Sequence, residues 1–219
     1  MTSPYYQDDH VTIYHGDCRE ILPGLRGDVV LTDPPYGIGL GYDQYQDSAD
    51  NLEALIADVM PLMLAAAPVV ALTPGIDNIW RYPPAKWVLC WYMSNACAST
   101  GRWGFNQWQP LLVYGTDPFL RRQMGRRPDV VITAAPNNGS DKRRGHPCPK
   151  PIEAWRKILT RVSPAEGELI MDPFMGSGST LDAAKYTGRK AIGIELSERY
   201  CEIAANRMGQ EVLDFGGVA

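Results

Sequence analysis

The sequence predicts an α/β fold in which a mostly parallel sheet carries helices on both faces. Short apolar segments alternate with helical patterns along most of the 219 residues, and such alternation favours parallel strands. Several apolar segments, such as VVLT and AIGI, are continuous, which is typical of strands buried on both faces. Residues 167–200 also contain a complete strand, glycine turn, helix and strand. The length suits one domain, residues 1–219.

Seven segments are predicted as strands because they are short, apolar and rich in β-branched or aromatic residues. In chain order they are Val11–Tyr14, Asp28–Thr32, Val69–Thr73, Trp87–Met93, Pro110–Tyr114, Glu168–Met171 and Lys190–Ile194.

Four helical patterns lie between these strands. Ser48 is placed to cap the first, which has an apolar stripe made by Leu52, Leu55, Ile56 and Val59. The second follows Pro151, a residue that suits the first turn of a helix. The third begins at Ser177 or Gly178, and the fourth begins after a cap at Ser197.

Composition limits the class of protein. Hydrophobic residues make up 45% and charged residues 21%, as in ordinary globular proteins. No apolar run approaches the roughly 20 residues of a membrane span, and the segment MTSPYYQDDH lacks the layout of a signal peptide. We therefore expect a cytoplasmic protein without membrane contact. The five cysteines form no Cys-x-x-Cys pair, so we expect reduced thiols and no metal site.

One segment departs from the acidic character of the chain, whose formal net charge is −4. Residues 117–150 hold eight basic and three acidic residues, whereas the remainder holds 13 basic and 22 acidic residues. Residues 116–145 also break the alternation of strands and helices, which predicts a small basic insertion. A basic insertion on an acidic body indicates a polyanion-binding segment, although a solvated loop is the alternative. The candidate contacts to a polyanion such as nucleic acid are Arg121, Arg122, Arg126, Arg127, Lys142, Arg143 and Arg144.

The glycine-rich turn in residues 172–180, DPFMGSGST, predicts a nucleotide site. Gly176 and Gly178 permit a tight turn and close approach of a ligand, and Glu195 lies about 20 residues further on, where a carboxylate binds ribose hydroxyls. The third glycine of a dinucleotide fingerprint is replaced by Leu181. Asp172 would repel a pyrophosphate but attract a cation. The turn therefore favours an adenosine that bears a positive group over NAD, and a turn without a ligand is the alternative.

The tetrapeptide DPPY, Asp33–Tyr36, follows a predicted strand and combines three chemical groups. Asp33 offers a carboxylate, Tyr36 offers an aromatic face, and the proline pair adds rigidity without backbone N–H donors. Such a rigid combination at the end of a strand is a candidate functional site. The alternative is a type I turn capped by Asp33, with Tyr36 in the core.

These motifs together resemble the amino-group DNA methyltransferases that use S-adenosylmethionine. DPPY resembles the catalytic motif, DPFMGSGST the cofactor loop, and GIELSERYCEIAANR the strand and helix after it. HPCPKP, residues 146–151, is similar to the segment that leads into the cofactor loop, and GDCREILPGL, residues 16–25, to the segment before the catalytic strand. The motif order resembles the beta class. The resemblance implies a Rossmann-like, class I methyltransferase fold of seven strands, with a target-recognition segment at residues 116–145.

The resemblance also implies a role for each matched residue. The catalytic motif is Asp33, Pro34, Pro35 and Tyr36, in which Asp33 and the Pro34 carbonyl accept the amine hydrogens while Tyr36 stacks on a base turned out of the duplex. S-adenosylmethionine is the implied cofactor. Its implied contacts are Asp17, Cys18, Asp33, Lys150, Asp172, Phe174, Gly176, Ser177, Gly178, Ser179, Thr180, Glu195 and Leu196.

Double-stranded DNA is the expected substrate, and Asp at the first motif position favours adenine N6 over cytosine N4 in this family. Cytosine N4 transfer stays an alternative, as does a DNA-binding module of the same fold without turnover. Transfer to RNA or to a protein glutamine usually goes with Asn-Pro-Pro-Tyr and the reverse motif order. The short insertion predicts a short or loosely defined target. The sequence leaves open a homodimer, and it leaves open a cognate restriction endonuclease or a solitary, phage-type enzyme.

Overall fold

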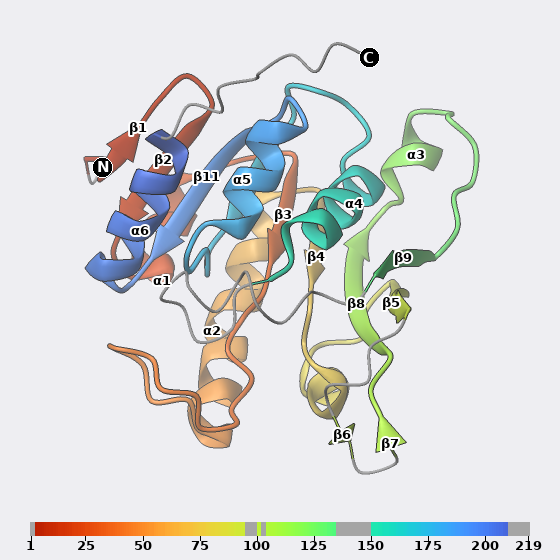
Figure 1. Ribbon diagram of the computed structural model, residues 1–219, viewed down its shortest axis with the longest axis horizontal. Helices are drawn as coiled ribbons and strands as arrows, with labels where there is room; N and C mark the ends of the chain where they lie inside the picture. The colour runs from red at the N-terminus through yellow and green to blue at the C-terminus, as the bar shows by residue number, and fades with distance from the viewer. Residues whose placement is uncertain (1–2, 95–99, 102–103, 135–149, 210–219) are drawn as a thin grey trace.

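A nine-stranded sheet forms the centre of the computed structural model, which describes residues 3–94, 100–101, 104–134 and 150–209 (Figure 1). The strand order is β1-β2-β11-β10-β3-β4-β8-β5-β9. β8 runs antiparallel to β4 and β5, β1 runs antiparallel to β2, and the other neighbouring pairs are parallel. The strands are β1 (Tyr6–Gln7), β2 (Val11–His15), β3 (Val29–Thr32), β4 (Val69–Leu72), β5 (Trp87–Ser94), β8 (Trp108–Gly115), β9 (Val130–Ala134), β10 (Leu169–Asp172) and β11 (Lys190–Glu195).

All seven predicted strands are present, but the expected total of seven was too low for the main sheet. The first addition, β1, has only two residues. The second, β9, lies in the segment predicted to leave the sheet and pairs with β5 at the sheet edge. Its residues alternate between exposed and buried, so the segment lacks the continuous apolar run that marks the central strands. A separate short pair is formed by β6 (Thr100–Gly101) and β7 (Gly104–Phe105).

Helices cover both faces of the sheet, as the sequence predicted (Figure 1). Every residue of β3 and β4 is buried, and neighbours in β3 join opposite cores, with Leu31 in one and Val30 in the other. The Leu31 core includes α4 (Ile152–Val162), α5 (Ser179–Tyr186) and α6 (Glu198–Gly209). The Val30 core includes α1 (Cys18–Ile21) and α2 (Ala49–Ala66). Within the described residues, no helix is both long and apolar enough to cross a membrane.

Local capping fixes where two of these helices begin. The Ser48 hydroxyl accepts a hydrogen bond from the Asn51 backbone N–H at 3.2 Å, so Ser48 caps α2 as predicted. Gly178 caps α5 in a left-handed conformation with φ of 80°. An ideal Cβ on Gly178 would lie 3.1 Å from the Ala204 Cβ. Glycine therefore suits this position both for its left-handed backbone and for the close approach of Ala204.

The strand order places several polar residues at one edge of the sheet. β11, β10, β3 and β4 are adjacent and parallel, so their carboxyl ends meet at this edge. Asp172 ends β10 and Glu195 ends β11, whereas Asp33 and Thr73 directly follow β3 and β4. These four residues, distant in sequence, surround the region described next.

Candidate active site

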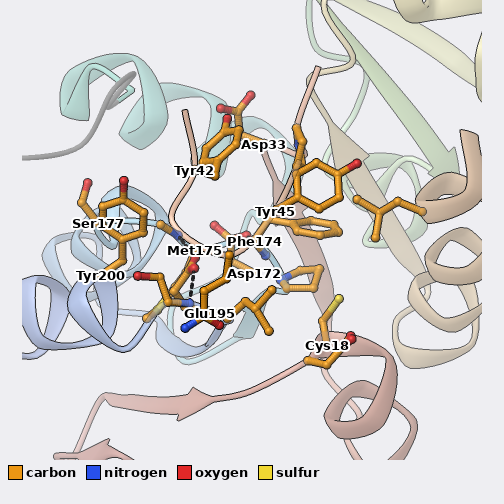
Figure 2. A pocket seen from close by; sticks show the side chains of 18 of the residues that line it. Cys18, Asp33, Tyr42, Tyr45, Asp172, Phe174, Met175, Ser177, Glu195 and Tyr200 are labelled. Atoms are coloured by element: carbon orange, nitrogen blue, oxygen red, sulfur yellow. Dashed lines mark hydrogen bonds between the residues drawn. The ribbon is translucent and has the colours of Figure 1, made fainter. Parts of the chain in front are cut away.

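A pocket opens at this carboxyl edge and gathers most of the predicted cofactor residues (Figure 2). Of that predicted set, only Gly178 is absent from the lining, because it sits in the cap of α5. Pro35 also lines the pocket, and Tyr36 joins it through hydrogen bonds to Asp33 and Lys150. DPPY, the glycine-rich turn, the start of α1 and Lys150 therefore converge on one cavity, whereas residues 146–149 of the HPCPKP motif lie outside the described residues.

Asp33 lies at the centre of a compact polar network. Its Oδ1 accepts hydrogen bonds from the Thr73 hydroxyl and, at 2.5 Å, from the Tyr36 hydroxyl. Its Oδ2 lies 2.6 Å from the Lys150 ammonium, which also donates to the Tyr36 hydroxyl at 2.8 Å. Burial, followed by the negative charge of Asp33, raises the pKa of Tyr36. Tyr36 consequently stays protonated and can donate to the carboxylate.

The main chain of Tyr36 is fixed from the side of β4. Its carbonyl accepts a hydrogen bond from the Asn78 side-chain amide at 2.8 Å, and the same amide also donates to the Pro74 carbonyl. Gly75 lies beside the Tyr36 ring with φ of +74°, and an ideal Cβ there would be 3.6 Å from the ring. The DPPY turn is therefore held by contacts that lie about 40 residues away in the sequence.

Asp172 lies beneath the pocket and is almost fully buried. Its Oδ1 accepts hydrogen bonds from the Thr32 hydroxyl at 2.6 Å and from the Phe174 backbone N–H at 3.0 Å. Burial raises the pKa of Asp172 to about 6, although these hydrogen bonds and one from Thr180 favour the charged form. A carboxylate with this little solvent is stabilised further by any cation that enters the pocket.

Glu195 braces the glycine-rich turn. One oxygen of its carboxylate accepts from the Gly176 backbone N–H at 3.0 Å and the other accepts from the Ser197 backbone N–H at 2.8 Å. Burial raises the pKa of Glu195. The carboxylate is thus oriented by the turn that it supports, and it lines the pocket; its contact with ribose hydroxyls stays a prediction.

The predicted contacts on α1 have structural partners of their own. The Asp17 carboxylate caps α1 by accepting from the Arg19 backbone N–H at 2.8 Å, and it pairs with the Arg19 guanidinium at 2.6 Å. Cys18 is buried beside the pocket, and burial raises the pKa of its thiol to about 12. Asp17 therefore combines a place in the pocket lining with the capping of α1.

A loop of residues 37–47 closes one side of the pocket, and none of its residues is among the predicted cofactor contacts. Tyr42 and Tyr45 line the cavity (Figure 2), and Asp43 lines it as well. The buried Asp47 carboxylate holds the base of the loop by accepting from the Gly37 backbone N–H at 2.6 Å and from two further N–H groups of the loop. No local motif marks this arrangement, because a single carboxylate gathers donors up to ten residues away.

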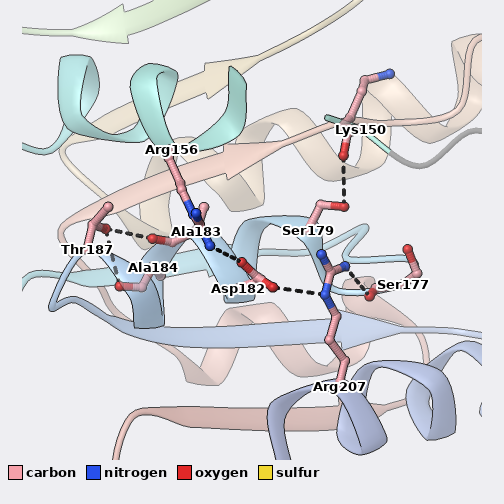
Figure 3. A network of polar contacts seen from close by, with 9 residues as sticks. All are labelled: Lys150, Arg156, Ser177, Ser179, Asp182, Ala183, Ala184, Thr187 and Arg207. Atoms are coloured by element: carbon pink, nitrogen blue, oxygen red, sulfur yellow. Dashed lines mark hydrogen bonds and ion pairs between the residues drawn. The ribbon is translucent and has the colours of Figure 1, made fainter. Parts of the chain in front are cut away.

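A second network outside the pocket supports the glycine-rich turn from the helices (Figure 3). Asp182 on α5 accepts from Arg156 on α4 at 3.2 Å and from Arg207 on α6 at 3.0 Å. Arg207 also donates to the Ser177 carbonyl at 3.2 Å. The network joins three helices to the turn, and only the tertiary structure shows it.

Of the residues predicted to contact DNA, the four described arginines, at positions 121, 122, 126 and 127, do not lie at this edge. They follow β8, which is antiparallel to β4, so the end of β8 meets the start of β4 through the pairing of Gly115 with Val69. Arg122 forms an ion pair with Glu168, and Arg127 lies 4.9 Å from the centre of the Phe119 ring. Arg121, Arg122, Arg126 and Arg127 are therefore at the edge opposite Asp33, and Lys142, Arg143 and Arg144 lie outside the described residues.

The fold and the pocket define a class of protein, the Rossmann-like enzymes that bind an adenosine cofactor at the carboxyl edge of the sheet. A family model described as DNA methylase, covering N6 and N4 transfer, matches residues 72–206. The match spans more than half of the chain, and the chain belongs to this family of amino-group DNA methyltransferases.

Comparisons with individual proteins agree with this assignment. The chain is 24% identical to the type II methyltransferase M.ScaI of Streptomyces caespitosus, over 96% of this chain and 85% of the relative. It is also 24% identical to M2.LlaDCHI of Lactococcus lactis subsp. cremoris, over 96% and 93%.

Solved structures share the fold. The M1.HpyAVI–SAM complex has a TM-score of 0.66 at 23% identity, covering 91% of this chain and all of the other. The cytosine-N4-specific PvuII DNA methyltransferase has a TM-score of 0.69 at 16% identity, covering 96% of this chain and 90% of the other.

The pocket suits S-adenosylmethionine, the cofactor of this family. The cofactor is an adenosine with a sulfonium cation and a zwitterionic amino acid. Asp33, Asp172 and Glu195 supply negative charge around the cavity, and the glycine-rich turn allows the backbone to approach a ligand closely. The chain is an S-adenosylmethionine-dependent DNA methyltransferase.

Proposed function

We propose that this methyltransferase modifies the N6 amino group of adenine in double-stranded DNA. The observation that carries the proposal is the Asp33 carboxylate, which stands at the pocket with Oδ1 held by Thr73 and Tyr36 and with Oδ2 directed to Lys150. Asp at this position, rather than Ser, is the form of the motif that favours adenine. The carboxylate is rigid and adjoins the cofactor pocket, as amine positioning requires.

The chemistry follows from the weak nucleophilicity of an exocyclic amine, whose lone pair is delocalised into the ring. Bound S-adenosylmethionine supplies an electrophilic methyl group. Asp33 Oδ2 accepts one amine hydrogen and the Pro34 carbonyl accepts the other, which directs the nitrogen lone pair toward the methyl group. The carbon–nitrogen bond forms as the bond from the methyl carbon to sulfur breaks, which leaves S-adenosylhomocysteine, and the nitrogen then loses a proton toward Asp33. Tyr36 stacks on the base outside the duplex.

DNA approaches this site from the carboxyl edge of the sheet, where the base must reach Asp33. The arginines of residues 121–127 lie at the other edge, so we do not assign them the contacts to the phosphates that flank the target base. Their ion pair and ring contact, with Glu168 and Phe119, give two of them a local structural role.

Sequencing with modified-base detection tests the proposal. DNA free of methylation is incubated with the protein and S-adenosylmethionine, and N6-methyladenine is the expected mark. The Asp33→Ala variant should leave no mark and should still bind S-adenosylhomocysteine in calorimetry, because other residues hold the cofactor. N4-methylcytosine as the mark would replace the adenine proposal with cytosine. Undiminished methylation by Asp33→Ala would refute the catalytic role of Asp33.

A further inference from the structure

Lys150 connects the cofactor side of the pocket to the catalytic motif. Its carbonyl accepts a hydrogen bond from the Ser179 hydroxyl at 3.3 Å, at the start of α5. Figure 3 shows the Lys150 side chain extending away from that contact. Its ammonium lies 2.6 Å from Asp33 Oδ2 and 2.8 Å from the Tyr36 hydroxyl, and only 11% of the side chain is exposed. One residue therefore contacts both halves of the site.

The Asp33 carboxylate has its donors in place before an amine arrives. Thr73 and Tyr36 donate to Oδ1, and Lys150 occupies Oδ2. Thr73 and Tyr36 take both lone-pair positions of Oδ1, so an amine that is to be polarised by this carboxylate binds at Oδ2. There the Lys150 ammonium lies 2.6 Å away and neutralises the carboxylate, so the amine is polarised most strongly when this donor contact is released.

The structure identifies which donor can move. Thr73 has no exposed surface, and its backbone N–H is bonded to the Thr32 carbonyl. Tyr36 is held through its carbonyl by Asn78. The Lys150 ammonium stands at the end of a four-carbon chain that lines the pocket, so it can change partners by rotamer changes alone.

Charge identifies the partner toward which Lys150 moves. The carboxylates of Asp33, Asp172 and Glu195 around the cavity suit a sulfonium cation but repel the carboxylate of its amino acid group. Among the residues that the structure describes, the other cation of the lining is Arg19, which is paired with Asp17 and Asp58. Lys150 is thus the cation placed to neutralise the carboxylate of the cofactor.

We propose that Lys150 is a positioning residue that couples the two substrates, because its ammonium moves from Asp33 to the cofactor carboxylate and so vacates Oδ2 for the target amine. Cofactor binding thereby prepares the base site. By linkage, a correctly bound base strengthens cofactor binding by the same factor. The inference rests on amine methylation as proposed above, and it holds for adenine and for cytosine alike.

Two binding measurements test the coupling in the full-length protein. Calorimetry compares S-adenosylhomocysteine with 5′-methylthioadenosine, which lacks the amino acid group. Fluorescence anisotropy then measures affinity for a duplex that carries the wild-type methylation site, with and without S-adenosylhomocysteine. The variants are Lys150→Met and Lys150→Arg. Lys157→Met is the matched control, because Lys157 is half exposed on α4 and pairs with Glu153.

We expect Lys150→Met to reduce the preference for S-adenosylhomocysteine over 5′-methylthioadenosine by about tenfold, the size of one charge-assisted hydrogen bond. The affinity for 5′-methylthioadenosine should stay unchanged, which a folding defect would not allow. S-adenosylhomocysteine should increase duplex affinity about tenfold in the wild type and in Lys157→Met, but not in Lys150→Met. Lys150→Arg should keep part of the preference.

Either of two results would overturn the coupling role: an unchanged ligand preference in Lys150→Met, or an unchanged effect of S-adenosylhomocysteine on DNA affinity in that variant. A methyl mark on cytosine would refute the adenine proposal and leave both measurements applicable with the cytosine-containing duplex. The two proposals can therefore fail independently.

Discussion

The buried carboxylate of Asp172 makes protein stability depend on pH in a direction opposite to that of most acids. Its pKa is about 6 in the folded protein, against 3.8 for the unperturbed group. The folded state therefore holds the proton more tightly than the unfolded state does. Below pH 3.8 the carboxyl group is mostly protonated in both the folded and the unfolded state, so its ionisation does not lower the free energy of unfolding. As the pH rises to 6 and above, ionised Asp172 destabilises the folded state increasingly.

The size of the effect follows from that difference in pKa. At about 1.4 kcal/mol for each pH unit, ionisation of Asp172 costs up to about 3 kcal/mol at pH 8. Between pH 5 and pH 8 the cost grows by about 1.5 kcal/mol. Asp172→Asn removes the ionisation but keeps the shape of the side chain. Its altered hydrogen bonds to Thr32 and Thr180 change the free energy of unfolding by an amount that does not depend on pH.

Urea unfolding at pH 5, 6, 7 and 8, followed by tryptophan fluorescence, measures this directly. We expect the stability of Asp172→Asn relative to wild type to increase by about 1.5 kcal/mol from pH 5 to pH 8. Asp8→Asn is the control. Burial opposes ionisation of Asp8, but hydrogen bonds led by Lys185 lower its pKa to about 2, so the loss in this variant should be constant over the same range. A constant difference for Asp172→Asn would refute the assigned effect of burial.

Three further predictions concern activity and DNA binding. Thr73→Val should lower kcat about tenfold and leave the affinity for S-adenosylhomocysteine unchanged, because the hydroxyl orients Asp33. Thr73→Ser keeps the hydroxyl and should keep the wild-type kcat. An equal loss of kcat in both variants would contradict this role. Arg207→Met should raise KM for S-adenosylmethionine about tenfold with little change in kcat, since Arg207 holds the Ser177 carbonyl of the glycine-rich turn. A fall in kcat with an unchanged KM would contradict a role of Arg207 in cofactor binding. Arg121→Ala combined with Arg126→Ala should leave the salt dependence of DNA binding unchanged, and a shallower slope would restore the arginines as phosphate contacts.

Much of the fold was predictable because its signals are local. The seven predicted strands were found since each is a short apolar run, and the continuous burial of β3 and β4 followed from their unbroken apolar sequence. The strand β9 was missed as a member of the sheet because alternating residues at an edge lack that signal. The arginine cluster was noticed by charge, but charge in a sequence carries no information about which edge of the sheet it reaches.

The site shows the same division. By itself, the sequence determined the chemical groups, since DPPY and the glycine-rich turn are contiguous motifs whose order also indicates the family. Only the tertiary structure decided how those groups are held. The Lys150 ammonium meets the Tyr36 hydroxyl across 114 positions of sequence, and the Thr73 hydroxyl meets Asp33 across 40. Such contacts depend on which strands lie side by side, and strand order is a property of the packed sheet that no local pattern encodes.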